Sequence, residues 1–309
     1  MDLTNRTMHP APALIALGET MALITPHDAT RLTDAESLRL TVGGAESNVA
    51  AHVALLGHHA AWVSALGDDP LGHRVRRTLT EQGVDTGWVT LDPDAPTGVY
   101  FKDPGHGVHY YRAGSAASRM SPQSVAAIPL EDAEIVHISG ITPALSQDCA
   151  AMIDAIVDRV AAADRAVLSF DVNHRAALWA APVAAPVLLA LANRSDIVFV
   201  GLDEAQTLWG CATPEDVRAL VPTPAHLVVK DGDVGATEFS LEGAEFVPAI
   251  PTEVVEAVGA GDAFAAGWLA ARLAGAPPQE RLQSGHERAH LVLQSTEDVV
   301  GVAATEVGE

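Results

Sequence analysis

The segment from Val255 to Phe264 (VEAVGAGDAF) joins small residues to a carboxylate, just before a helix that we predict over Ala265–Leu273. Small residues let a phosphate approach the backbone, and the start of a helix offers free N–H groups and the positive end of its dipole. Asp262 could then take the proton of a hydroxyl group that attacks the phosphate. A plainer interpretation is that Asp262 caps the helix and the glycines form a tight turn.

The same glycines do not predict a dinucleotide site. Phe264 occupies the third position of the G-x-G-x-x-G pattern, where glycine or alanine is needed. Too few residues follow Phe264 to complete one half of a dinucleotide-binding fold. A dehydrogenase is therefore disfavoured.

A second glycine-rich stretch, Lys230-Asp231-Gly232-Asp233-Val234-Gly235, follows an expected strand. It could hold nucleotide phosphates, with Gly232 and Gly235 allowing close approach and Lys230 supplying a positive charge. A simple hairpin turn explains the same residues. The chain has no Walker A loop, because neither of its two lysines precedes serine or threonine.

A third stretch, Val42 to Asn48 (VGGAESN), opens an expected helix. Gly43 and Gly44 would let a ligand lie against the backbone, and Asn48 can both donate and accept hydrogen bonds to hydroxyl groups. An ordinary glycine turn before a helix is the alternative.

Composition limits the partners of such a site. The 18 basic and 40 acidic residues give a net charge of −22, which repels nucleic acids and anionic membranes, so we expect neither as a partner. That charge also repels ATP. A phosphate site must therefore depend on backbone amides, a divalent cation and a few well-placed cationic side chains.

Other features indicate a cytoplasmic location. The sequence has no apolar run long enough to span a membrane, and residues 1–12 resemble a loose tail rather than a signal peptide. The two cysteines, Cys149 and Cys211, lie far apart and outside any metal-binding pattern, as is typical of a reduced intracellular protein.

Strands and helices alternate through most of the chain. Short apolar runs predict strands at Ala13–Leu17, Ala60–Ala65, Ile135–Ile138, Ala166–Phe170, Ile197–Val200 and His226–Val229. Helical periodicity predicts helices at Ser47–Leu56, Leu71–Gln82, Gln147–Ala163 and Asp203–Trp209. This order indicates an α/β fold with a mostly parallel sheet covered by helices on both faces.

Two regions, Met21–Val42 and Trp88–Arg112, instead show two-residue periodicity without helices between. We expect them to form a small antiparallel lid on one domain that spans residues 13–300. Exposed lid strands invite pairing with a second copy, so a homodimer through the lid is a further expectation.

Three motifs occur in order: the Gly-Gly-x-x-x-Asn start at Gly43, Gly67-Asp68-Asp69-x-x-Gly72 after a strand, and Gly259-Ala260-Gly261-Asp262. Together they resemble the PfkB/ribokinase family of carbohydrate kinases over residues 13–300. The resemblance implies a lid that closes over a sugar, Asp262 as the general base and the amides of Gly259, Ala260 and Gly261 as an anion hole. It also implies Mg²⁺ and an ATP held along Lys230–Gly235 and the C-terminal helices.

Within that family the chain is most similar to kinases of 2-keto-3-deoxygluconate. The residues that carry this similarity are Thr97–Tyr100, Tyr110–Ser118 and Asp171–Arg175 with Trp179. By position, the residues that would face the sugar acid are Tyr100, Tyr110, Arg112 and Arg175. Asn173 would lie toward the phosphates of ATP.

The net charge independently supports a role for Arg112 and Arg175 in binding a sugar acid. A carboxylate that enters a protein of net charge −22 needs guanidinium partners. Three alternatives stay open. Arg112 could be an exposed strand residue, Arg175 could pair with Asp171, or Arg175 could contact the transferred phosphate.

Two positions depart from the family pattern. Glu256 replaces the aspartate ahead of the anion-hole loop, so a monovalent-cation site there is uncertain. Gly201 replaces the asparagine of Asn-x-x-Glu, while Glu204 keeps the carboxylate expected to act on hydrated Mg²⁺ through water.

Two other functions remain possible at this point. A kinase of a neutral sugar, such as a fructokinase, would share the fold. A non-catalytic sugar-binding regulator would need neither Asp262 nor the anion hole. The sequence does not separate the gluconate from the galactonate epimer.

Overall fold

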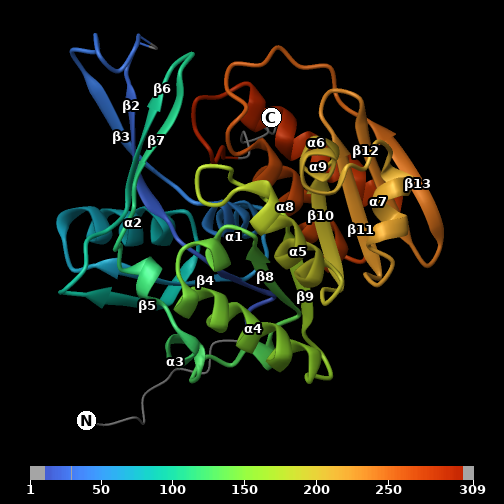
Figure 1. Cartoon of the computed structure of the whole chain (residues 1–309). Helices are drawn as coiled ribbons and strands as arrows, with labels where there is room; N and C mark the ends of the chain where they lie inside the picture. Colours follow the sequence, from blue (N-terminus) through green and yellow to red (C-terminus); the bar gives the residue numbers. More distant parts are fainter. Residues whose placement is uncertain (1–10, 29, 302–309) are drawn as a thin grey trace, which may run out of the picture.

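The computed structural model describes residues 11–28 and 30–301, which form two sheets of unequal size (Figure 1). The larger sheet has nine strands in the order β13-β12-β11-β10-β9-β8-β1-β4-β5. Its strands are β1 (Leu14–Leu17), β4 (Ala60–Gly67), β5 (Asp85–Asp92), β8 (Ile135–Ser139), β9 (Val167–Asp171), β10 (Ile197–Gly201), β11 (His226–Asp231), β12 (Gly235–Ser240) and β13 (Gly243–Pro248).

Neighbouring strands from β5 to β11 pair in parallel, and β12 and β13 complete the sheet as antiparallel strands. All six strands expected from the sequence are present in this sheet. The mostly parallel α/β fold is therefore confirmed. The expected N-terminal tail lies largely outside the described residues.

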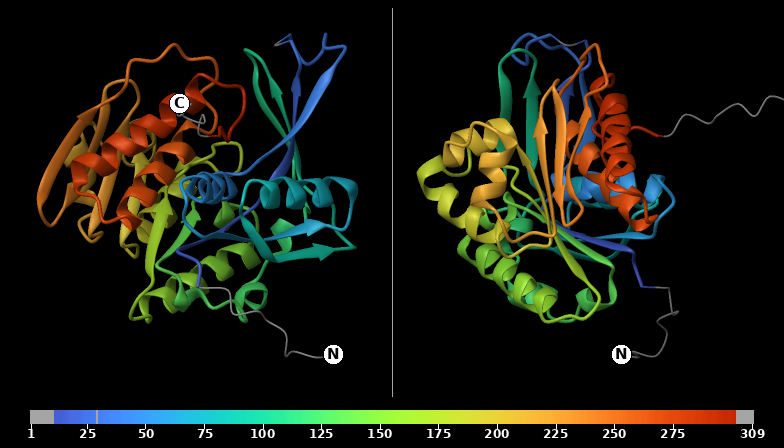
Figure 2. Two further views of the ribbon diagram at one scale, coloured as in Figure 1. Left: turned by 180° about the vertical axis from the view of Figure 1, so that it is seen from behind. Right: turned by 90° about the vertical axis from the view of Figure 1, so that its right-hand side faces the viewer.

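Helices cover both faces of the large sheet, as the right-hand view of Figure 2 shows. The helices are α1 (Ala45–Leu55), α2 (Pro70–Glu81), α3 (Pro122–Val125), α4 (Gln147–Ala161), α5 (Ala181–Ala192), α6 (Leu202–Trp209), α7 (Pro214–Leu220), α8 (Ala260–Leu273) and α9 (Pro278–Leu293). Side chains of α1, α2, α8 and α9 pack into the core on one face, and those of α3 to α7 pack on the other. Strand β1 contributes to both cores, because successive side chains alternate between faces.

The small sheet has the order β3-β2-β6-β7 and projects from the main body beside α8 and α9 (Figure 1). It comprises β2 (Met21–Pro26), β3 (Leu38–Gly43), β6 (Val99–Asp103) and β7 (Gly107–Tyr111). We call it the lid sheet. Its location fits the expected excursions from the main sheet.

Two details of the lid prediction were wrong. Residues Trp88–Asp92 belong to β5, which pairs with β4 at the edge of the large sheet. Two-residue periodicity reveals a strand but not the sheet that it joins. The lid sheet is also not wholly antiparallel, since β2 and β6 pair in parallel. In the chain, β2 follows β1 and β6 follows β5. Because β1 and β5 point the same way in the large sheet, β2 and β6 also extend in the same direction.

The parallel strands direct their carboxyl ends toward one edge of the large sheet. Asp171 and Gly201 end β9 and β10, and Lys230 lies at the end of β11. Open α/β sheets usually bind ligands at this edge. Among the described residues, no helix is long and apolar enough to cross a membrane.

Candidate active site

Asp262 lies in the first turn of α8, which begins at Ala260 rather than at Ala265 as predicted. The residue before it, Gly259, adopts a left-handed conformation with φ of 89°, which glycine tolerates far better than other residues. The Asp262 carboxylate accepts hydrogen bonds from Asn48 Nδ2 at 2.9 Å and Asn173 Nδ2 at 3.4 Å. It makes no capping bond, so the interpretation of Asp262 as a helix cap is wrong.

Burial raises the pKa of Asp262 to about 7. The hydrogen bond from Asn48 opposes this shift, the nearby Asp171 carboxylate adds to it, and the charges of Arg175 and Lys230 reduce it. A base is most effective when its pKa lies near the working pH. The environment of Asp262 therefore suits proton transfer near neutral pH.

The loop before Asp262 carries amides that can receive an anion. The amides of Gly259 and Gly261 donate no hydrogen bond to any of the described residues. The Ala260 amide donates a long bond to Ala257 O at 3.3 Å. A Cβ placed on Gly261 would lie 3.5 Å from Lys230 Nζ. Two free amides and an ammonium thus meet at the start of α8, which is a favourable place for a phosphate.

Lys230 is held there by Asp171. Its Nζ donates to Asp171 Oδ2 at 3.1 Å. Burial alone would lower the pKa of Lys230, but the carboxylates of Asp171 and Glu204 outweigh it and raise the pKa. Among the described residues Asp171 forms its ion pair with Lys230 and none with Arg175, so the alternative in which Arg175 pairs with Asp171 is wrong.

Glu204 connects two of the loops at this edge. Its Oε1 accepts from the His174 amide at 2.8 Å and its Oε2 accepts from the Gly201 amide at 2.9 Å. Burial, and then the charge of Asp171, raise the pKa of Glu204. A side chain at position 201 would meet Asp203 Oδ1 at 2.5 Å, so the asparagine of the family pattern would displace Asp203.

The same region carries carboxylate oxygens of the kind that Mg²⁺ binds, directly or through water. Within the described residues, no cluster of three or more His, Cys, Asp or Glu side chains could bind a metal by itself. However, Asp171 Oδ1 is buried without a hydrogen-bond partner, and Glu204 lies close enough to interact with Asp171. Mg²⁺ prefers oxygen ligands and keeps several waters when it binds phosphates.

The tyrosines expected to face the sugar stack on each other, with ring centroids of Tyr100 and Tyr110 5.7 Å apart. Tyr100 is buried, and its hydroxyl donates to Asp298 Oδ2 at 3.3 Å. Tyr110 is half-buried and lines a cavity of about 580 Å³ together with Arg112. The far wall of this cavity is formed by Ala144, Leu145, Ala177 and Leu178.

Arg112 is not an exposed strand residue, so that alternative is wrong. Its Nε donates to Glu19 Oε2 at 2.6 Å, its Nη2 contacts the same oxygen, and both side chains are buried. Ser115 Oγ also donates to Glu19. The guanidinium that was expected to bind a substrate carboxylate thus already has a carboxylate partner.

Arg175 differs from Arg112 in this respect. Its Nη1 donates to the carbonyl of His174 at 3.2 Å, and no carboxylate of the described residues forms an ion pair with it. Its charge still lowers the pKa of Asp262 and of Glu204, which places it close to both. Arg175 is therefore a cation at the site that remains available to a ligand.

The remaining glycines have structural explanations. A Cβ on Gly43 would lie 2.1 Å from the Tyr100 hydroxyl, and one on Gly44 would meet Glu19 O at 2.4 Å. These positions thus accommodate protein atoms, and contact with a sugar remains a prediction. Gly232 lies in the turn between β11 and β12 and Gly235 begins β12, so both belong to the hairpin that was the simpler interpretation. Nucleotide contact there remains a prediction as well.

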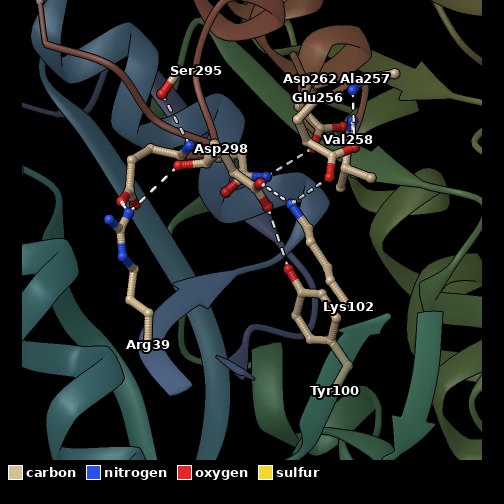
Figure 3. Close-up of polar contacts among 12 residues, drawn as sticks. Arg39, Tyr100, Lys102, Glu256, Ala257, Val258, Asp262, Ser295 and Asp298 are labelled. Atoms are coloured by element: carbon tan, nitrogen blue, oxygen red, sulfur yellow. Dashed lines mark hydrogen bonds and ion pairs between the residues drawn. The ribbon is translucent and has the colours of Figure 1, made fainter. Parts of the chain in front are cut away.

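Sequence reasoning missed three residues of the site: Glu19, Lys102 and Asp298. Lys102 donates to Asp298 Oδ1 at 3.0 Å and lies 3.9 Å from Glu256 Oε2 (Figure 3). The Lys102 ammonium thus lies next to Glu256, the residue near which the sequence left a monovalent-cation site uncertain. One signal could have revealed Lys102, because the chain has only two lysines and the other is Lys230.

Comparisons with known proteins agree with this geometry. The family model described as "pfkB family carbohydrate kinase" matches residues 12–303. The 2-dehydro-3-deoxygalactonokinase of Haloferax volcanii is 32% identical, with 95% of each chain covered. The 2-dehydro-3-deoxygluconokinase of Bacillus subtilis is also 32% identical, covering 94% of this chain and 93% of its own.

The fold also matches a solved structure with bound nucleotide. A putative ribokinase II from E. coli, in complex with ATP and Mg²⁺, superimposes with a TM-score of 0.85 at 25% identity. The match covers 94% of this chain and 95% of that protein.

Proposed function

This chain belongs to the pfkB family of carbohydrate kinases, and on that premise we propose that it transfers the γ-phosphate of ATP to a hydroxyl of 2-keto-3-deoxygluconate or of its galactonate epimer. It is a phosphotransferase with an alcohol group as acceptor, similar to 2-dehydro-3-deoxygluconokinases. One observation carries the chemistry. A buried carboxyl with a pKa of about 7, Asp262, lies next to the free amides of Gly259 and Gly261.

The proposed reaction begins when Asp262 takes the proton of the sugar hydroxyl. The hydroxyl oxygen then attacks the γ-phosphorus, the bond to the bridging oxygen breaks, and ADP leaves. Asn48 and Asn173 hold the Asp262 carboxylate in place for this step. Since phosphoryl transfer depends mostly on positioning and charge stabilisation, the remaining task is to hold the transferred group.

The amides of Gly259, Ala260 and Gly261 would stabilise the negative charge on the transferred phosphoryl group. Lys230 adds a positive charge at the same place, and Asn173 lies between Asp262 and the end of β9. Bound Mg²⁺ would neutralise phosphate charge, and Asp171 and Glu204 would hold it through water. Because Glu204 already accepts two amide bonds, it also keeps the His174 and Gly201 loops together.

Arg175 is the main support for an acidic substrate. A guanidinium without a carboxylate partner is costly beside a buried site unless a ligand completes it. A sugar acid offers the matching carboxylate, and a protein of net charge −22 needs such local attraction to bind an anion. Arg112, at the same cavity as Tyr110, is proposed as the second contact.

A neutral sugar is the second candidate, because Glu19 already neutralises Arg112. With the charge of Arg112 compensated, the guanidinium of Arg175 could instead contact the transferred phosphate. The pair Glu19 and Arg112 would then serve as hydrogen-bonding groups for sugar hydroxyls. A fructokinase-like activity follows from this alternative.

A panel of substrates separates the two candidates. Purified protein with Mg²⁺ and ATP is assayed by ADP release with 2-keto-3-deoxygluconate, its galactonate epimer, fructose and ribose. We expect the highest kcat/KM with one of the two sugar acids. A preference for fructose would replace the sugar-acid proposal with the neutral-sugar one.

Arg175→Leu then tests the carboxylate contact. A hydrogen bond to a charged group contributes about 1.5–3 kcal/mol, so kcat/KM for the sugar acid should fall by roughly 10- to 150-fold. The residual activity with a neutral sugar should change much less. Equal losses with both classes would instead place Arg175 at the transferred phosphate.

Arg112→Leu is the companion variant, but it leaves the buried Glu19 carboxylate unpaired. Its thermal stability must therefore be measured alongside its kinetics. Arg112→Lys keeps the charge beside Glu19 and should restore part of the sugar-acid activity, since an ammonium cannot make the planar two-bond contact.

A further inference from the structure

The second lysine of the chain lies outside the phosphate site but reaches toward it. Lys102 is on lid strand β6, two residues after Tyr100, so both side chains leave the same face of the strand. Both reach Asp298, Tyr100 OH to Oδ2 and Lys102 Nζ to Oδ1 (Figure 3). Asp298 comes from the segment after α9, almost 200 residues further along the chain.

Asp298 in turn contacts the glycines of both ligand-binding motifs. A Cβ on Gly43 would lie 2.8 Å from Asp298 Oδ2, and a Cβ on Gly259 would lie 3.2 Å from Asp298 Cα. The His52 ring also lies against the Asp298 carbonyl, with Nε2 at 3.1 Å, so α1 fixes its backbone. Asp298 is therefore packed between the sugar-side loop and the anion-hole loop.

Glu256 completes the connection. Its Oε1 accepts from the amides of Ala257 at 2.9 Å and Val258 at 3.2 Å, which shapes the loop that leads into Gly259. Its other oxygen, Oε2, faces Lys102 Nζ at 3.9 Å. One ammonium from the lid thus contacts two carboxylates that both border the anion hole.

The surroundings make this charge important. Lys102 and Asp298 are buried, and Asp298 and Glu256 would repel each other without a cation between them. Removing one partner from a buried ion pair leaves an uncompensated charge, which is strongly unfavourable. Without the ammonium, we expect the Glu256 loop to move away from Asp298 and carry the Gly259 amide with it.

We propose that Lys102 is a positioning residue that couples the lid to the anion hole. Its ammonium holds Glu256 and Asp298 together, so that the Gly259 and Gly261 amides are aligned only while strand β6 lies in its place. The inference rests on the anion-hole role proposed above. It adds that the lid helps to build the catalytic loop as well as covering the sugar.

The chain provides a matched control. Arg39 of lid strand β3 pairs with Glu297, the neighbour of Asp298, and both side chains are about two-fifths exposed. This pair also joins the lid to the C-terminal segment, yet it does not contact Glu256 (Figure 3). Arg39→Met removes a lid contact without removing the charge beside the anion hole.

The test compares steady-state kinetics with whichever sugar the wild-type protein phosphorylates. Lys102→Met should lower kcat by about tenfold to a hundredfold, with little change in KM for ATP. Arg39→Met should stay within about twofold of wild type, as is usual for an exposed pair. Equal kcat values for the two variants would overturn the proposal.

Two further measurements separate alignment from simple stability. Glu256→Gln keeps the Oε1 acceptor but removes the charge, and it alters a partly exposed side chain, so the protein should fold even if Lys102→Met does not. Glu256→Gln should itself lower kcat, and the double variant should lose no more than the worse single variant, because coupled residues are not additive. An unchanged kcat in Glu256→Gln, or fully additive losses, would contradict the coupling.

Chemical rescue is the last readout. Lys102→Ala leaves space near Asp298, so ammonium chloride should restore part of kcat where sodium chloride at equal ionic strength does not. Identical responses to the two salts would count against a local role for the ammonium. If Asp262→Asn is fully active, the proposed phosphoryl-transfer role of this site itself falls. A normal dependence on Asp262 with an unaffected Lys102→Met overturns this inference alone.

Discussion

The Asp262 carboxyl lies among groups that act on its charge in opposite directions. Burial and Asp171 favour its protonated form, whereas Asn48, Arg175 and Lys230 favour the ionised form, and the outcome is a pKa of about 7. A carboxyl accepts a proton only when it is ionised. Activity that depends on Asp262 as a base should therefore be lost as the pH falls through that pKa.

Asn48→Leu tests this balance. The hydrogen bond from Asn48 lowers the pKa of Asp262, so its removal should raise that pKa and move the acidic limb of the pH–kcat/KM profile to higher pH. The profile of kcat/KM for the sugar is measured from pH 5 to 9 at saturating ATP, so it reports the enzyme–ATP complex. Wild type should show its acidic midpoint near 7.

Asp262→Asn is the control for the same profile. It should lower kcat by roughly 10²–10⁴ and leave nucleotide affinity nearly unchanged, because only the proton acceptor is removed. Its remaining activity should also lack the acidic limb. A variant with half the wild-type activity would remove Asp262 from the role of base.

At the scale of elements, the lid sheet is joined to the main body through the chain and through side-chain contacts. The chain enters β2 from β1 and β6 from β5, and Arg74 of α2 donates to Leu40 O of β3. The Lys102–Asp298 and Arg39–Glu297 pairs connect the lid sheet to the C-terminal segment. Tyr110 and Arg112, at the end of β7, line the cavity beneath it. A ligand in that cavity would contact both the lid and the main body.

Sugar binding should therefore slow hydrogen exchange in the lid. Amides of β3 and β7, the two edges of the lid sheet, should exchange more slowly once the preferred sugar is present, because closure excludes water. Strand β5 belongs to the large sheet and serves as the internal control. Unchanged exchange in all four lid strands would argue against closure.

At the scale of the whole molecule, the lid also presents an unpaired surface. Leu38 in β3 is 51% exposed and Tyr111 in β7 is 69% exposed, and both lie on edge strands. Exposed edges with apolar side chains are templates for pairing with another chain. The expected homodimer through the lid would cover them.

Sedimentation measures this directly. We expect a particle of twice 32.2 kDa, and Leu38→Glu with Tyr111→Glu should shift it toward the monomer, because two carboxylates would be buried at the interface. Leu241→Glu is the control, since Leu241 is 95% exposed in the turn between β12 and β13. A wild-type monomer at all concentrations tested would contradict pairing through the lid.

The sequence by itself determined much of this protein. Apolar runs predicted six of the seven parallel strands, because buried strands need continuous apolar side chains whatever their neighbours are. Helical periodicity predicted α1, α2, α4 and α6. The order of the glycine motifs indicated the kinase family, and the resemblance to that family made Asp262 the candidate base. These features are local, so they can be seen in a linear pattern.

Only the tertiary structure decided what the charged side chains contact. Glu19 precedes Arg112 by 93 residues and Asp298 follows Lys102 by 196, and no local pattern relates such distant positions. Periodicity likewise could not assign Trp88–Asp92 to the large sheet, since a strand has the same alternation in either sheet. Ion pairs, strand partners and the pKa of a buried carboxyl depend on which residues meet in space, and the fold alone establishes that.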